Sequence, residues 1–433
     1  MTRLFLIPLL ALLLASCGPS HRIARSARTT LLTDSSLLHA HIGITVYEPS
    51  TGRTWYDYQG DKYFVPASNT KIPTCYAAMK YLGDSLVGLR YADADEQLYI
   101  LPTADPTLLH RDYPIQPVYT FLKGTTKKLA FVRPSWDDTE YGAGWTWSDY
   151  GESYMPERSS LPIYGNTVMF SVQSRNGRNV VVPDIRFFNP LVNELVDSVT
   201  SRIAVRRRRL ENRFDVVPAA SRFTRAEIPF QTYENERLLE DTVGKRWLTN
   251  VYAPTALRYT VIHSQPTDSM LKPMMHRSDN FFAEQSLLMV ANERLGVMSQ
   301  ERIIDTLLKT DLADLPQKPR WVDGSGLSRY NLFTPRDFVA ILQKMEREFG
   351  VARVRTILAT GNEGTLTNYY KAAAGRFYGK TGTLSGVVAL SGYLQTNSGR
   401  HLIVSVLVNN HQASAAAVRR AVEAFLEGIR TRY

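Results

Sequence analysis

The chain has 433 residues, of which 44% are hydrophobic and 21% are charged, so it is long enough for more than one domain and apolar enough for a folded core. This composition excludes wholesale disorder. The formal net charge of +10 favours an anionic partner, such as a membrane surface or a cell-wall polymer. Because no zinc finger and no repeated basic-aromatic module accompanies the charge, we interpret it as a surface property and expect no nucleic-acid partner.

The first residues predict export. Arg3 precedes an apolar run from Leu4 to Leu14, which is too short to stay in a bilayer as a spanning helix. We therefore predict a signal peptide over residues 1–16 and a chain that faces the periplasm. The sequence Leu-Ala-Ser-Cys, which ends at Cys17, resembles the lipobox of bacterial lipoproteins. That resemblance implies a lipid on the Cys17 thiol and a membrane-anchored protein; a simple secretory signal with an incidental cysteine is the alternative.

Residues 17–36 are basic and polar, and we expect them to form a tether behind the lipid. The chain holds two cysteines, Cys17 and Cys75. A lipidated Cys17 leaves Cys75 without a disulfide partner. We interpret Cys75 as a free thiol that packs in the core.

Four elements are predicted towards the two ends of the chain. Residues 41–59 alternate around a Pro-Ser-Thr-Gly turn and predict a β-hairpin, and residues 386–410 repeat this design around Asn-Ser-Gly. Residues 334–350 predict a helix, with Thr at the cap, Pro at the first position and Gly at the end. Residues 414–429 predict a final helix.

The middle of the chain, residues 92–261, is rich in Tyr, Trp, Pro and short alternating runs. We interpret it as an inserted, mostly strand-built region, with a smaller nested domain at about residues 175–245. It carries a basic block from Val205 to Leu210. A solvated face or loop is the simplest interpretation of this block, and a contact with cell wall or membrane is the sharper alternative.

Ser68 and Lys71 stand one turn apart where a helix begins. A serine at this place usually caps the helix by accepting a backbone N–H, but a lysine in the first turn is unfavourable against the helix dipole. On one helix face, a neutral Lys71 amine could take the proton of the Ser68 hydroxyl. Burial and a second nearby cation would both favour that neutral form. Pro73 removes one N–H and could kink the first turns of the helix.

Two further short motifs carry candidate side chains. One opens an apolar helical run and reads Ser278-Asp279-Asn280. The other lies on a predicted strand and reads Lys380-Thr381-Gly382-Thr383. A strand edge with a lysine and two hydroxyls suits an extended anionic substrate, and Gly382 allows close approach. Taken alone, a helix cap and an exposed strand would explain the two motifs as well.

In this order, Ser-x-x-Lys, Ser-Asp-Asn and Lys-Thr-Gly form the active-site set of penicillin-binding proteins and class A β-lactamases. Further segments agree with this set: Asp105–Leu108, Gly144–Tyr150, Asp323–Pro335 and Glu363–Leu366. On these motifs the chain resembles D-alanyl-D-alanine carboxypeptidases of the DacB type, which are class C low-molecular-mass penicillin-binding proteins. The resemblance covers about residues 42–410 and is densest at its two ends.

The resemblance implies an α/β (α+β) fold of the penicillin-binding-protein/β-lactamase type, with an antiparallel sheet flanked by helices and a large, mostly β insertion. The transpeptidase-like catalytic domain would comprise residues 37–91 and 262–433, and the insertion residues 92–261. The segment between Ser68 and Ser278 is longer than a compact β-lactamase needs. The chain also lacks the Glu-x-x-Leu-Asn setting with which class A β-lactamases activate water, which favours slow or absent β-lactamase activity.

The resemblance also implies the chemistry. Ser68 would attack the carbonyl between two D-alanines of a peptidoglycan stem peptide and form an acyl-enzyme. Lys71 would act as the base, and Ser278 would pass a proton to the departing D-alanine. The backbone N–H groups of Ser68 and Thr383 would form the oxyanion hole. A β-lactam would acylate Ser68 in the same way and leave slowly.

Substrate binding would fall to four side chains. Asn280 would bind the substrate amide and orient Lys71. The terminal carboxylate would be held by Lys380, Thr381 and Thr383. The chain departs from the family pattern at Tyr369 and Tyr370, near where relatives often carry arginine.

We therefore predict an enzyme, a serine-type D-Ala-D-Ala carboxypeptidase, with DD-endopeptidase cleavage of cross-links as an open second activity. A β-lactamase or esterase that uses the same serine is one rival, and a catalytically silent wall-binding lipoprotein is another. A silent scaffold has no chemical need for Lys71 or Ser278, which argues against it. The eight histidines are scattered and no phosphate-binding glycine loop is present, so we expect no metal and no other cofactor.

Overall fold

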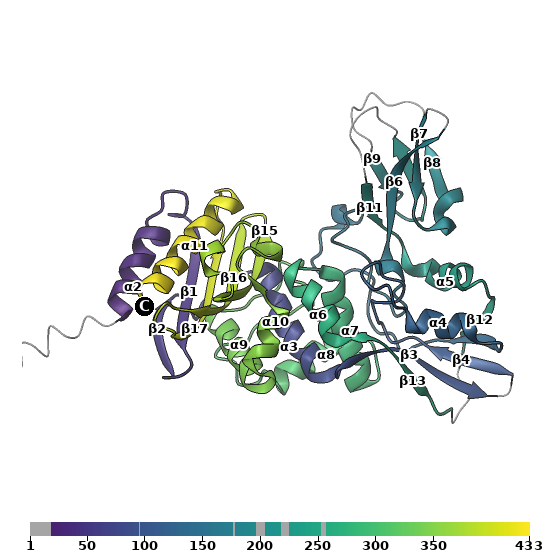
Figure 1. Cartoon of the computed structure of the whole chain (residues 1–433), viewed down its shortest axis with the longest axis horizontal. Coiled ribbons are helices and arrows are strands. Elements are labelled where there is room, and N and C mark those ends of the chain that lie inside the picture. The colour runs from purple at the N-terminus through teal and green to yellow at the C-terminus, as the bar shows by residue number, and fades with distance from the viewer. Residues whose placement is uncertain (1–18, 95, 176–177, 196–203, 218–224, 253–256) are drawn as a thin grey trace, which may run out of the picture.

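The computed structural model describes residues 19–94, 96–175, 178–195, 204–217, 225–252 and 257–433. The predicted signal peptide and Cys17 lie outside these residues. Figure 1 shows a sheet flanked by helices at one end of the molecule and the inserted region, drawn mostly in blue and teal, at the other. Among the described helices, none is both long and apolar enough to cross a bilayer.

The first body is built on a six-stranded antiparallel sheet in the order β14-β15-β16-β17-β1-β2. Its strands are β1 (His41–Glu48), β2 (Arg53–Tyr58), β14 (Ala359–Thr360), β15 (Phe377–Leu384), β16 (Val387–Gln395) and β17 (His401–Asn409). β1 lies beside β17, with Ile44 opposite Val406, so the two ends of the chain meet in the sheet. Both predicted hairpins are confirmed.

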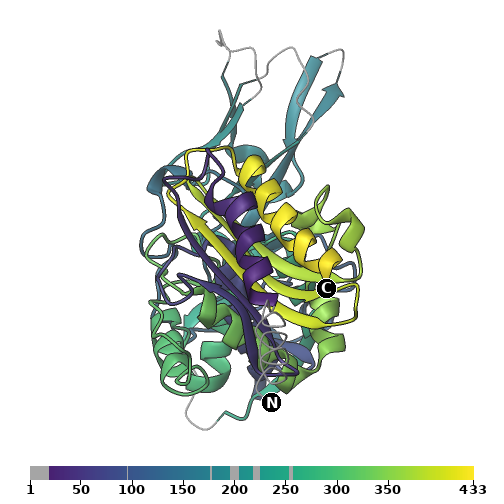
Figure 2. The ribbon, with the colours of Figure 1, turned by 90° about the vertical axis from the view of Figure 1, so that its left-hand side faces the viewer.

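Helices cover both faces of this sheet, and each face has its own apolar core. On one face, α2 (Pro19–Ala27) and α11 (Ala415–Arg432) lie side by side, as Figure 2 shows in purple and yellow. The opposite core is built from α3 (Lys71–Tyr81), α6 (Thr267–His276), α7 (Asn280–Leu295), α8 (Gln300–Lys309), α9 (Pro335–Phe349) and α10 (Val351–Ile357). The predicted fold class, an antiparallel sheet flanked by helices, is confirmed.

The cap predicted at Thr334 is present, and a second cap lies at Ser414. The Thr334 hydroxyl accepts from the Asp337 N–H at 3.1 Å, and the Asp337 carboxylate accepts from the Thr334 N–H at 2.9 Å, which forms a reciprocal capping box. Pro335 holds the first position of α9. Ser414 caps α11 through the Ala417 N–H at 3.2 Å, and this helix continues beyond the predicted end.

The tether predicted over residues 17–36 is wrong for its described part. Residues 19–32 form α2 and a π-helical turn, Arg28–Leu32, which pack against α11. The side chains of Ile23, Ala27 and Leu31 are at most 1% exposed. Their four-residue spacing marks one apolar helix face. The arginines and serines around them led us to predict a solvent-exposed tether instead of a packed helix.

The inserted region contains a mixed five-stranded sheet in the order β12-β5-β4-β3-β13. Its strands are β3 (Ser85–Ala94), β4 (Gln97–Leu101), β5 (Lys128–Val132), β12 (Trp247–Val251) and β13 (Thr260–Pro266). Two helices accompany it, α4 (Pro117–Gly124) and α5 (Asn235–Val243). The sheet begins before the predicted boundary at 92 and ends after the one at 261, because β3 starts at Ser85 and pairs there with Pro266 at the end of β13.

Two three-stranded sheets, β11-β6-β7 and β8-β10-β9, form the far end of the insertion. Their strands are β6 (Thr167–Arg175), β7 (Arg178–Pro183), β8 (Val192–Glu194), β9 (Ala204–Arg207), β10 (Phe214–Val217) and β11 (Arg225–Pro229). The rings of Phe170 and Phe214 join the two sheets, with centroids 4.9 Å apart. This unit spans residues 167–229, displaced from the predicted 175–245.

The basic block at Val205–Leu210 is only partly a solvated face. Arg207 is 1% exposed and stacks over the Tyr150 ring, 5.2 Å from its centroid. Arg208 is exposed and pairs with Asp215 at 3.1 Å. The block therefore contributes both to the core of the insertion and to its surface.

Candidate active site

An open cleft lies where the catalytic domain and the inserted region meet. The first body contributes Ser68, Ser278, Asn280, Thr383 and the turns at Gly326–Arg329 and Leu384–Ser385, and the inserted region contributes Trp145, Thr146, Asp149, Tyr154 and Met155. The cleft therefore brings together three motifs that are widely separated in sequence. It also exposes these motifs to side chains of the insertion.

Ser68 does not cap a helix. It lies in a 3-10 turn, Ala67–Thr70, that leads directly into α3, and neither helical segment has a side-chain cap. Pro73 is the third residue of α3, where a backbone N–H has no partner within the helix in any case. α3 continues through Pro73 as one helix to Tyr81, and the Ser68 hydroxyl contacts Lys71 Nζ.

Lys71 is completely buried beneath Ser68. Its Nζ lies 3.1 Å from Ser68 Oγ and donates to Asn280 Oδ1 at 2.6 Å and to the Ser325 carbonyl oxygen at 2.7 Å. Burial lowers the pKa of Lys71 to about 8, although the charges of Glu284, Asp323 and Asp279 oppose this shift. The neutral amine is therefore accessible near physiological pH, and burial is the reason, as the sequence led us to expect.

The residues of the Ser-Asp-Asn motif have different roles: Asp279 caps a helix, whereas Ser278 and Asn280 line the cleft. Asp279 caps α7 by accepting from the Phe282 N–H at 3.1 Å, so the cap interpretation holds for this residue. Ser278 has a positive φ of 64°, a strained conformation that often marks functional residues. Asn280 accepts from Lys71, as predicted, while its Nδ2 donates to the Tyr154 carbonyl oxygen at 2.8 Å.

Lys380 is buried as deeply as Lys71. Its Nζ donates to Ser278 Oγ at 2.9 Å and to the carbonyl oxygen of Thr381 at 2.7 Å. Burial, followed by the charges of Lys71 and Arg419, lowers the pKa of Lys380 well below its ordinary value. Lys380 Nζ is therefore buried below the surface of the cleft, where it contacts Ser278 Oγ.

Strand β15 passes against the backbone of the nucleophile. A Cβ on Gly382 would lie 2.6 Å from the Pro66 carbonyl oxygen and 3.0 Å from the Ser68 nitrogen. Asn69 fastens the same contact, since its amide donates to the Lys380 carbonyl oxygen at 2.7 Å and accepts from Ser391 Oγ at 2.7 Å. Position 382 therefore has to be glycine because the turn that holds Ser68 lies against it. From the sequence, we expected the substrate to be the group that approaches Gly382 closely.

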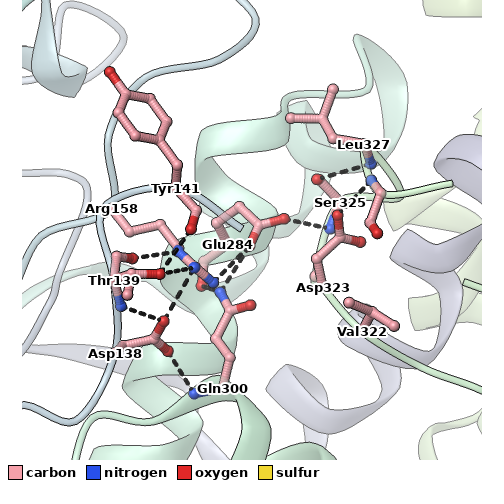
Figure 3. A network of polar contacts seen from close by, with 12 residues as sticks. Asp138, Thr139, Tyr141, Arg158, Glu284, Gln300, Val322, Asp323, Ser325 and Leu327 are labelled. Carbon is pink, nitrogen blue, oxygen red and sulfur yellow. Dashed lines mark hydrogen bonds and ion pairs between the residues drawn. The ribbon is translucent and has the colours of Figure 1, made fainter. Parts of the chain in front are cut away.

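A network of buried charges is built around Glu284 and Arg158 (Figure 3), and Ser325 connects it to Lys71. Glu284, on α7, accepts from the Ser325 N–H at 2.8 Å, and the Ser325 carbonyl accepts from Lys71. Arg158, from the inserted region, lies 3.6 Å from Glu284 and 3.0 Å from Asp138. Burial, reinforced by the nearby Asp323, raises the pKa of Glu284. The inserted region thus supplies Arg158, the cation that lies beside Glu284, and Glu284 is connected through Ser325 to Lys71.

Several functional contacts are not predictable from the motifs alone. Trp145 donates through Nε1 to Asp323 at 2.8 Å, and Tyr154 accepts from Asn280 through its carbonyl. The segment Gly144–Tyr150 stood out for its resemblance to the family, but its sequence gave no role. Glu284 follows Asn280 by four residues on α7. This helical spacing, which places the two residues on one face, was the sequence signal that could have identified Glu284. Cys75 is a buried free thiol in α3, as predicted.

The sequence pattern of the D-Ala-D-Ala carboxypeptidase 3 (S13) family matches residues 26–212 and 242–429. A D-alanyl-D-alanine carboxypeptidase from Actinomadura sp. (strain R39) is 26% identical over 96% of this chain and 88% of its own length.

Two solved structures share the fold. Penicillin binding protein 4 (dacB) from Haemophilus influenzae has a TM-score of 0.73 at 19% identity and covers 94% of this chain and 98% of its own. A predatory peptidoglycan endopeptidase from Bdellovibrio bacteriovorus has a TM-score of 0.50 at 15% identity and covers 90% of this chain and 93% of its own.

Proposed function

The chain belongs to the D-Ala-D-Ala carboxypeptidase 3 (S13) family, and from this premise we propose that it removes the terminal D-alanine from peptidoglycan stem peptides through an acyl-enzyme on Ser68. The observation that carries this proposal is the position of Lys71 Nζ, 3.1 Å from Ser68 Oγ in a buried site that lowers its pKa to about 8. A base poised near neutral pH is what activation of a serine requires.

Acylation begins when neutral Lys71 takes the proton of Ser68 and Ser68 Oγ bonds to the carbonyl carbon between the two D-alanines. The carbonyl oxygen becomes an oxyanion, which the backbone N–H groups of Ser68 and Thr383 stabilise by about 3 kcal/mol per donor. The C–N bond then breaks. Ser278 passes its hydroxyl proton to the departing nitrogen and takes the proton held by Lys71, so the proton taken from Ser68 is replaced by one on free D-alanine and Lys71 is neutral again. The contact of Ser278 with Lys380 at 2.9 Å supports this role.

Deacylation needs only water. Water adds to the ester carbonyl while Lys71 accepts one of its protons, and the Ser68 Oγ–C bond breaks as the proton returns to Ser68. A β-lactam opens on Ser68 in the same way, and its fragment stays attached for longer.

Labelling with a fluorescent penicillin tests the nucleophile. We expect a covalent adduct on the folded protein that Ser68→Ala abolishes and that the exposed Ser148→Ala retains. Incubation with a pentapeptide ending in D-Ala-D-Ala should release D-alanine from the wild type only. A wild type without adduct would identify a catalytically silent scaffold, and rapid turnover of the penicillin would identify a β-lactamase.

We also propose DD-endopeptidase cleavage of peptide cross-links as a second activity of the same site. The cleft is large, and its insertion side presents Trp145, Asp149 and Tyr154, which leaves room for the second peptide of a cross-link. Digestion of a cross-linked muropeptide dimer measures this activity, and monomer products that disappear with Ser68→Ala are the expected result.

We propose further that the chain is an exported lipoprotein with its lipid on Cys17. Support comes from the sequence Leu-Ala-Ser-Cys that ends at Cys17, and α2 begins at Pro19. A groove beside this helix start is lined by His21, Arg22, Ala24, Arg25, Arg28 and Arg432. Exposed arginines next to a lipid attract anionic headgroups by about 1 kcal/mol each.

A further inference from the structure

The proposed reaction leaves open which charge holds the carboxylate of the leaving D-alanine. Lys380 was the expected cation, but its Nζ is fully buried and engaged by Ser278 and by its own strand. The other two expected groups, the hydroxyls of Thr381 and Thr383, are neutral. A cation at the surface of this strand is therefore missing from the motif set.

Arg419 lies at the required place. It comes from the second turn of α11, which covers the outer face of the sheet. Its Nη2 donates to Thr383 Oγ1 at 2.5 Å, and Thr383 lines the cleft beside Ser68. Arg419 also lines a narrow, mostly apolar pocket with Thr381 and Thr365, whose hydroxyls are 2.7 Å apart.

The Arg419 guanidinium is available for an anion. Its ring contact is Tyr369, whose centroid lies 5.9 Å from the guanidinium carbon. Within the part of the chain that the structure describes, no carboxylate lies within ion-pair distance of Arg419. The neighbouring Arg420 differs, because it pairs with Glu423 at 2.6 Å and stacks over the same Tyr369 ring at 4.2 Å.

We infer that Arg419 binds the carboxylate next to the scissile amide, together with the hydroxyls of Thr381 and Thr383. A planar guanidinium suits this task, because it presents two parallel N–H donors to one carboxylate. The inference rests on the proposed reaction at Ser68, whose leaving group carries that carboxylate. It assigns to the C-terminal helix a part in substrate selection that none of the three motifs provides.

The test compares two pentapeptides that end in D-Ala-D-Ala, one with a free carboxylate and one with a C-terminal amide. Arg419→Ala should lower kcat/KM for the free acid by about ten- to a hundredfold, the effect of losing a hydrogen bond to a charged group. The amide should change by less than about threefold, a limit set by the lost packing alone. Arg419→Lys should recover part of the loss, and Arg420→Ala should leave the preference for the acid unchanged.

Equal losses for the two peptides, or an unchanged preference in Arg419→Ala, would overturn the inference. Thermal unfolding of each variant identifies a folding defect, in which case Arg419→Gln takes the place of Arg419→Ala. Binding of both peptides to Ser68→Ala separates this inference from the proposed reaction. A preference for the acid that depends on Arg419 would uphold the inference even if the wild type released no D-alanine. Release of D-alanine by the wild type and equally well by Arg419→Ala would uphold only the reaction.

Discussion

Lys71 combines full burial with three hydrogen-bond partners, and its environment works in two directions. Burial lowers its pKa to about 8, while Glu284, Asp323 and Asp279 favour the charged form. The base is therefore largely protonated below pH 8 and largely neutral above it. Stronger compensation by the three acids would keep Lys71 protonated at neutral pH, and burial without them would lower its pKa further.

This balance predicts the pH dependence of acylation. The rate at which a fluorescent penicillin labels Ser68 should rise with pH and level off above about pH 8, because Lys71 is the base only when neutral. Glu284→Gln removes a charge that raises the pKa of Lys71, so the inflection should move to lower pH. The amide of the variant can still accept from the Ser325 N–H. An inflection that stays in place or moves to higher pH would contradict this assignment.

Lys71→Arg serves as the second variant for the base. An arginine stays protonated at every accessible pH, so acylation should fall by about a hundred- to ten-thousandfold and lose its inflection. Circular dichroism and thermal unfolding check that the variant is folded. Retention of the wild-type rate would show that Lys71 is not the base.

Among the elements, the contact between the inserted region and α7 links folding to the site. Arg158 is 4% exposed and Glu284 is 1% exposed, so neither charge can be solvated if the other is removed. Arg158→Met should lower the free energy of unfolding by about 3–5 kcal/mol, the usual effect of breaking a buried pair. Chemical denaturation measures this change.

Two further variants keep this prediction specific. Arg302→Met, which breaks a surface pair with Asp137, should cost less than about 1 kcal/mol. Adding Glu284→Gln to Arg158→Met should recover part of the lost stability, because position 284 then holds no unpaired buried charge. Equal losses of unfolding free energy in Arg158→Met and Arg302→Met would show that the buried ion pair stabilises the protein no more than the surface pair does.

Local chemistry explains which elements could be predicted from the sequence. The cap at Thr334, the alternation of the two hairpins and the three motifs all depend on residues close together in the chain. The burial of Lys380, the pairing of Arg158 with Glu284 and the reach of Arg419 to Thr383 depend on how distant elements pack. The α2 helix is an intermediate case, since the spacing of Ile23, Ala27 and Leu31 was visible but outweighed by polar neighbours.

The whole molecule has two distinct ends. α2 and the C-terminus lie at one end, and the two small sheets of the insertion lie at the other (Figures 1 and 2). Residues of both the catalytic domain and the insertion line the cleft. A lipid on Cys17 would hold the α2 end at a membrane, because α2 packs on the catalytic domain and begins two residues after the cysteine. The inserted sheets would then point away from the bilayer, towards the peptidoglycan.

This orientation can be measured by energy transfer to labelled lipid headgroups. Arg432→Cys and Arg186→Cys each place one exposed thiol, the first at the α2 end and the second on the insertion, while the native Cys75 is buried and should not react. In vesicles that hold the lipidated protein, we expect strong transfer from position 432 and weak transfer from position 186. Cys17→Ala should abolish both and leave the protein unlabelled by lipid precursors. Equal transfer from the two positions would mean that the molecule lies along the membrane, with its cleft beside the bilayer.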